Sequence, residues 1–179
     1  MMIKIEDILS YNEISRNDLL ILLKSEAKLI NINDIMKATS FLISDSKYVQ
    51  GNYRKEYLKT YTSAFISRIK EVKEYEAHDN EYLDIEEVQK AIGLLLKQDT
   101  EITGTEGFDP AFFQIYKIIS LYTTFILLES VPTVGTPFPG GLKVKYNGKN
   151  YLCPVKERQK DNPGAVCGFC ISIQDPKTI

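Results

Sequence analysis

The residues best suited to chemistry in this chain are its three cysteines, which all lie within the last 27 residues. Cys167 and Cys170 form a Cys-Gly-Phe-Cys pair, and Cys153 begins the sequence Cys-Pro-Val-Lys. A C-x-x-C turn is typical of zinc sites, because it brings two thiolates to one tetrahedral ion. The spacing therefore predicts a metal site, with zinc as the expected metal and Cys153, Cys167 and Cys170 as ligands.

Such a site needs a fourth ligand, and the sequence leaves its identity open. Lys156 stands where the first knuckle of a zinc ribbon carries its second cysteine, and a protonated lysine cannot bind a metal. His78 is the only histidine, and its distance along the chain favours an exposed side chain with no role. The candidates are His78, Glu157, Asp161, Asp175 or a water molecule.

Two other uses of the thiols remain open. The three cysteines could instead hold an iron–sulfur cluster, although such clusters usually have four cysteine ligands. Alternatively, Cys167 and Cys170 form a redox-active dithiol, or all three cysteines are plain free thiols. A thioredoxin-type fold is excluded because only nine residues follow Cys170. The zinc-deaminase signature is excluded because the chain lacks both of its halves.

Two other segments are candidates for binding. Residues 143–179 carry seven basic and three acidic side chains, so this part is positive in a chain of net charge -2. Its cations suggest a nucleic-acid surface, but lysines that protect the edge of a solvated hairpin explain them better. The glycine-rich stretch 135–141 is expected to be a rigid connector, with a binding groove as the alternative. The cations in question are Lys143, Lys145, Lys149, Lys156, Arg158 and Lys160.

The elements that position the cysteines follow from hydrophobic periodicity. We expect a mainly α fold, in which about five or six helices pack around a buried central helix at 111–128. Proline and glycine then end the helical pattern between residues 132 and 141. The chain is expected to be a single domain over 1–179, with a helical body at 1–130. A loop, a β-hairpin and a cysteine-bearing tail follow at 131–179.

The hairpin is predicted from Asn147-Gly148, which lies between two runs of alternating apolar and polar residues. A two-residue turn there places Val144 opposite Tyr151 and Leu142 opposite Cys153. This register puts Cys153 on the apolar face at the end of a strand.

The N-terminal residues turn acidic at once and contain no apolar secretory segment. The apolar stretch 111–128 contains Gln114 and Lys117, so a buried core helix explains it better than a membrane span. We therefore expect a soluble cytoplasmic protein.

The C-terminal 45 residues or so resemble those of an uncharacterised protein family from methanogenic archaea. The resemblance rests on the Gly-Thr-Pro-Phe-Pro-Gly-Gly stretch at 135–141, the Tyr-Leu-Cys-Pro-Val-Lys run at 151–156, the segment 159–165 and the Cys-Gly-Phe-Cys pair at 167–170. It implies that the two cysteine motifs belong to one site, and that Lys156 is not merely a lost ligand position. It also implies an anaerobic archaeal cytoplasm, and it brings no known activity.

Together these features favour a binding or regulatory module that contains a metal site. The expected partner is an unknown protein or small molecule. The alternative is an enzyme or electron carrier that uses an open coordination position on zinc or on an iron–sulfur cluster.

Overall fold

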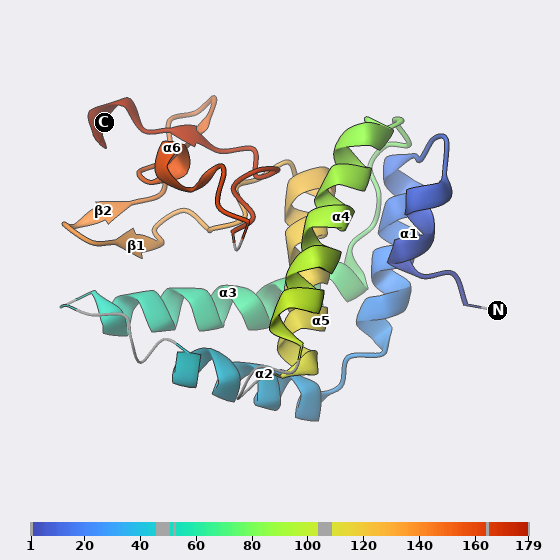
Figure 1. Cartoon of the computed structure of the whole chain (residues 1–179), viewed down its shortest axis with the longest axis horizontal. Helices are drawn as coiled ribbons and strands as arrows, with labels where there is room; N and C mark the ends of the chain where they lie inside the picture. The colour runs from blue at the N-terminus through green and yellow to red at the C-terminus, as the bar shows by residue number, and fades with distance from the viewer. Residues whose placement is uncertain (1, 46–50, 52, 104–108, 164, 179) are drawn as a thin grey trace.

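The computed structural model of the chain describes residues 2–45, 51, 53–103, 109–163 and 165–178. Helices occupy the chain as far as residue 126, and strands β1 to β5 all follow residue 136 (Figure 1). The prediction of a mainly helical chain with a small β-containing C-terminal part is thus confirmed. The helices of the body are η1 (Ile5–Ser10), α1 (Arg16–Lys28), α2 (Ile32–Asp45), α3 (Arg54–Glu74), α4 (Ile85–Ile102), α5 (Pro110–Leu121) and the π-helical η3 (Tyr122–Ile126).

Local sequence signals set the starts of three of these helices. The Ser15 side chain accepts the backbone N–H of Asp18 at the start of α1. Asp84 caps α4, and Asp109 caps α5 with Pro110 in its first turn. These side chains bond backbone N–H groups that have no partner inside the helix, which stabilises each helix start.

Helix α5 is the centre of the helical body, as its sequence predicts. It contacts α1, α2, α3 and α4. Ile115, Ile118 and Leu121 are fully buried, and the polar side chains of Lys117 and Ser120 are buried as well. Such burial on several faces explains why the segment is apolar enough to raise the question of a membrane helix. Within the described ranges, no helix has the length and apolar character that crossing a bilayer requires.

The hairpin forms, but the predicted register is wrong. Strand β3 (Lys145–Tyr146) pairs antiparallel with β4 (Tyr151–Cys153), and Tyr146 lies opposite Tyr151. Four residues, 147–150, therefore make the turn instead of two. The side-chain oxygen of Asn147 accepts the backbone N–H groups of Lys149 and Asn150 at 2.9 and 2.7 Å, and this closes the longer turn.

The residues before β3 pair in another direction. Strand β2 (Leu142–Lys143) pairs with β1 (Pro137–Phe138), so Leu142 lies opposite Phe138 and not opposite Cys153. Val144 is buried, and its backbone N–H donates to the carbonyl of Thr136. The proline- and glycine-containing segment is therefore hydrogen-bonded to the hairpin and not only a lead into it.

The remaining elements complete a C-terminal lobe over residues 131–178. They are α6 (Lys156–Gln159), β5 (Ile173–Gln174), which pairs parallel with β4, and η4 (Pro176–Thr178). The lobe lies beside α4 and above α3 in the view of Figure 1. The side-chain amide of Gln98 on α4 donates to the carbonyls of Pro163 and Ala165 and so ties the lobe to the body.

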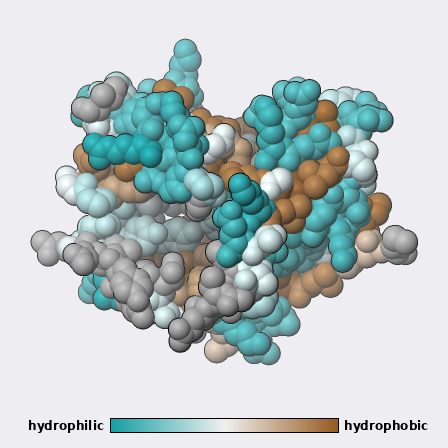
Figure 2. Space-filling model, viewed as in Figure 1, coloured by the Kyte–Doolittle hydropathy of each residue, from teal (hydrophilic) through white to brown (hydrophobic). Residues whose placement is uncertain are grey.

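The outer surface is mixed in character. Figure 2 shows a mostly hydrophilic face, with hydrophobic side chains visible between α4 and α1. Exposed apolar residues here include Ile21 on α1 and Leu29 directly after it.

Candidate functional site

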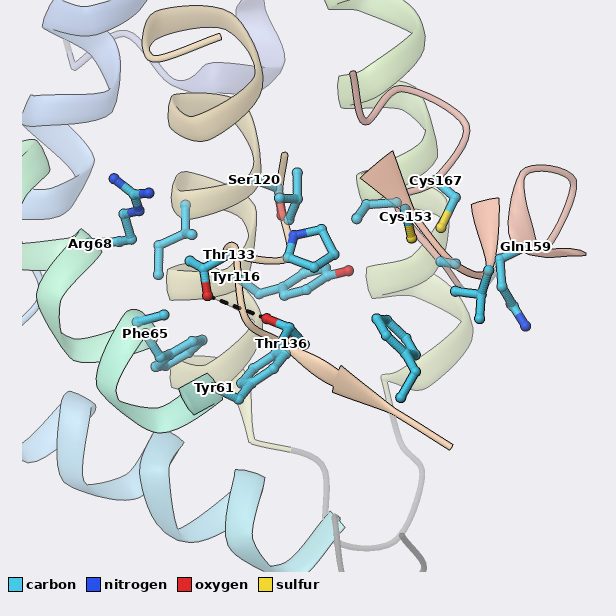
Figure 3. Close-up of a pocket in the computed structure, with 18 residues that line it drawn as sticks. Tyr61, Phe65, Arg68, Tyr116, Ser120, Thr133, Thr136, Cys153, Gln159 and Cys167 are labelled. Carbon is cyan, nitrogen blue, oxygen red and sulfur yellow. Dashed lines mark hydrogen bonds between the residues drawn. The ribbon is translucent and has the colours of Figure 1, made fainter. Parts of the chain in front are cut away.

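The three cysteines come together in the C-terminal lobe. Cys153 ends β4, while Cys167 and Cys170 lie in the loop between α6 and β5. All three are free thiols, and each of Cys153 and Cys167 interacts electrostatically with the other two. Figure 3 shows Cys153 and Cys167 next to each other at one side of a cavity. The predicted site residues are thus near neighbours.

Lys156 has a structural role that the sequence did not reveal. Its ammonium group donates hydrogen bonds to the backbone carbonyls of Cys167 and, at 2.7 Å, of Cys170. These charge-assisted bonds hold the Cys-Gly-Phe-Cys turn against the Cys-Pro-Val-Lys segment. The two motifs therefore form one unit, in which Lys156 fixes the backbone that carries the thiols.

The Cys170 thiol is surrounded by hydrogen-bonding groups. The backbone N–H of Val131 donates to its sulfur at 3.4 Å. The hydroxyl groups of Ser130 and Ser172 lie 3.7 and 3.3 Å from the same atom. These contacts fix the position of the Cys170 sulfur in the lobe.

Burial disfavours the charged form of the Cys153 and Cys167 thiols. It raises the pKa of Cys153 and of Cys167, because the charged thiolate is poorly solvated there. The Cys170 thiol raises both pKa values further, the Cys153 thiol adds to the rise at Cys167, and the Lys156 ammonium opposes both shifts. Both groups are therefore neutral near pH 7, which argues against a reactive thiol nucleophile in the metal-free chain.

The raised pKa predicts how Cys167 reacts with an alkylating reagent. In folded, metal-free protein, the rate at which iodoacetamide modifies Cys167 should keep rising with pH. It should still rise above the pH at which the same rate in the unfolded chain levels off. Ionisation is harder in the folded state, so the same shift makes the folded chain lose stability as pH rises. Mass spectrometry of the Cys167 peptide measures the profile. A modification rate that levels off at a lower pH in the folded protein than in the unfolded chain would contradict a raised pKa of Cys167.

The proposed fourth ligands do not join the thiols in this arrangement. His78 is exposed and packs its ring against Tyr75 in the helical body, with the ring centroids 5.6 Å apart. Glu157 pairs with Lys160, and Asp161 is exposed. Asp175 is buried, but its carboxylate accepts the backbone N–H of Lys177. Among the described residues, no group of three or more Cys, His, Asp or Glu side chains is placed to hold a metal ion.

A cavity of about 320 Å³ lies between the helical body and the lobe. Figure 3 shows Arg68 and Phe65 on one side of it and the two thiols of Cys153 and Cys167 on the other. The segment that the sequence marked as a connector supplies part of the wall. Thr136 and Phe138 come from this segment, and Pro132 and Thr133 just before it also line the cavity.

The polar groups around the cavity are mostly satisfied. Arg68 donates to Glu71 at 3.0 Å and to Glu129 at 2.6 Å, so its charge is balanced by two carboxylates. The Thr133 and Thr136 hydroxyls bond each other at 3.3 Å. The Ser120 hydroxyl differs, because it is fully buried and has no hydrogen-bond partner in the described part of the chain.

Ion pairs with nearby carboxylates divide the basic patch that the sequence suggested. Lys143 pairs with Glu56 on α3, and Lys160 pairs with Glu157. Lys156 is half-buried among the carbonyls described above. This pairing favours the explanation by solvated surface lysines over a nucleic-acid surface.

Comparison with known proteins places the chain in a family. Residues 15–175 match the family described as an uncharacterised protein conserved in archaea (DUF2115). The chain belongs to this family. A UPF0305 protein of Methanothermobacter thermautotrophicus is 40% identical over 88% of this chain and 94% of its own length. A second UPF0305 protein from that organism is 30% identical over 88% of this chain and 95% of its own.

A UPF0305 protein from Methanococcus maripaludis is 32% identical over 83% of this chain and 90% of its own length. The resemblance to an uncharacterised family from methanogens is thereby confirmed, and these names state no activity. No solved structure matches the chain.

Proposed function

We propose that this chain is a binding module of the reducing archaeal cytoplasm whose C-terminal lobe takes up one zinc ion on Cys153, Cys167 and Cys170. The observation that carries the proposal is the gathering of all three thiols of the chain in one small lobe, within electrostatic reach of one another. Thiolates are the preferred protein ligands of zinc and other soft ions.

The surroundings of the thiols support this use. Backbone N–H groups reach the sulfur of Cys170 from Val131 and that of Cys153 from Val155 and Lys156. Such donors stabilise bound thiolates and orient them. The strands of the lobe are only two or three residues long, so a bound ion adds stability that a small core lacks.

The proposal includes a local rearrangement. The thiols and the nearby carboxylates do not yet form a group that holds an ion in the described residues. Binding must therefore move the sulfur atoms onto one centre and recruit a fourth group, either a protein side chain or water. Because zinc displaces thiol protons, its affinity should fall as pH is lowered.

A second candidate function follows from the position of two thiols. Cys153 and Cys167 line the cavity, so an ion on them would face a space that admits a small molecule. An open coordination position there suits an enzyme, and an iron–sulfur cluster there suits an electron carrier. Metal identity separates the two candidates, because a cluster is coloured and contains iron.

The test is elemental analysis of protein purified without oxygen, together with a visible spectrum. We expect one zinc per chain and no colour. Cys167→Ser should lose the metal, whereas Lys160→Met, in the same lobe but outside the thiol group, should retain it. Iron with broad visible absorbance would replace the zinc proposal by the cluster. Metal-free protein that takes up no added zinc and has three titratable thiols would refute both.

A further inference from the structure

Four aromatic side chains line the cavity, three of them from the helical body. Tyr61 and Phe65 come from α3, Tyr116 from α5 and Phe138 from β1. The Tyr61 and Phe65 rings are stacked, with centroids 6.4 Å apart. Aromatic rings bind other flat rings well, through large contact area and edge or face packing. The wall therefore suits a planar ring system.

The charge in the wall is already balanced. Arg68 is the one charged side chain among the described residues of the lining, and its guanidinium bonds Glu71 and Glu129. An ionised ligand would leave water and find no free counter-charge, which is costly. The cavity therefore favours an uncharged molecule.

One fully buried hydroxyl in the wall has no hydrogen-bond partner among the described residues. The Ser120 hydroxyl is buried in the last turn of α5, two residues before the π-helical η3 begins, and forms no hydrogen bond in the described structure. A serine inside a helix commonly bonds the carbonyl four residues before it, and this one does not. Figure 3 shows Ser120 at the rim of the ring of lining side chains. The hydroxyl has no accessible surface, so a ligand oxygen can satisfy it only if the side chains that cover it shift.

From these observations we infer that the cavity binds a small, uncharged aromatic molecule with one hydroxyl group, which hydrogen-bonds Ser120. The volume of about 320 Å³ is at the lower end for ligand pockets and has room for two fused rings. The inference is independent of zinc. Ser120 and most of the aromatic rings belong to the helical body, so failure of metal binding leaves it intact.

The experiment compares 2-naphthol, naphthalene and 2-naphthoate as probes, by calorimetric titration of the full-length chain. We expect one site per chain, with 2-naphthol bound more tightly than naphthalene and 2-naphthoate bound most weakly. Ser120→Ala should weaken 2-naphthol binding by roughly tenfold, because the probe loses its hydrogen-bond partner. Its affinity for naphthalene should be unchanged, which also shows that the variant is folded.

A matched control lies on the next helical turn. Thr123 is buried and its hydroxyl also has no partner in the described structure, but it does not line the cavity. Thr123→Val should therefore bind 2-naphthol as the unmodified chain does. Ala64 on α3 lines the cavity, and Ala64→Leu should weaken both neutral probes by filling it.

Three outcomes would overturn the inference. One is the absence of 2-naphthol binding to the unmodified chain. Another is an equal loss of 2-naphthol affinity in Ser120→Ala and Thr123→Val, which would exclude a specific bond to Ser120. The third is 2-naphthoate binding as tight as that of 2-naphthol, which would exclude an uncharged ligand class.

Discussion

Replacing Ile115 by alanine should lower the free energy of unfolding by about 2–5 kcal/mol, since it removes buried methyl groups from the centre of the fold and leaves a cavity. Ile115 is fully buried on α5, which contacts helices α1 to α4. Chemical denaturation followed by circular dichroism measures the loss.

The control for this prediction is Ile66→Ala on α3. Its side chain is 42% exposed, so the same change should cost roughly 1 kcal/mol or less. Equal losses in the two variants would show that α5 is not the core of the body. Separate unfolding transitions for the helices and for the C-terminal lobe would contradict the prediction of a single domain.

Lys156→Met should destabilise the C-terminal lobe by about 1.5–3 kcal/mol, because two part-buried carbonyls lose a charged hydrogen-bond donor. The ammonium of Lys156 bonds the carbonyls of Cys167 and Cys170, and methionine keeps the length of the side chain without the donor. Hydrogen exchange of the amides over residues 151–178 measures the change. The loss should be larger there than in α1 and α4.

Lys160→Met is the matched control in this lobe. Lys160 follows α6 directly and pairs with Glu157 on the surface, where water and salt screen the interaction. Its replacement should leave exchange in the lobe unchanged. Equal effects of the two substitutions would mean that Lys156 acts only as a surface charge.

Local signals made much of the fold predictable. Ser15, Asp84 and Asp109 bond backbone N–H groups two or three residues further along the chain, so these helix starts depend only on residues close in sequence. The apolar segment at 111–128 identified the central helix because burial on several faces requires it. The hairpin was predicted from Asn147-Gly148, but its register depended on the Asn147 side chain, whose bonds lengthen the turn.

The site was predictable only in part, because much of it depends on contacts between distant segments. Spacing along the chain marked Cys153, Cys167 and Cys170 as neighbours. It gave no sign that Lys156 bonds the carbonyls of Cys167 and Cys170, which lie 11 and 14 residues away. Ser120 looks like an ordinary helical serine in the sequence. Its unpartnered hydroxyl matters only because α3 and the lobe enclose a cavity around it.

The most direct test of the central claim is the absorption spectrum of the protein titrated with cobalt(II) without oxygen. Cobalt takes the same tetrahedral thiolate sites as zinc and reports sulfur ligands by a charge-transfer band. The account predicts a band that saturates at one cobalt per chain, weakens in each single cysteine-to-serine variant and disappears when zinc is added. A titration without a thiolate band, or a band that is the same in Cys153→Ser as in the unmodified chain, would contradict a site shared by the three cysteines.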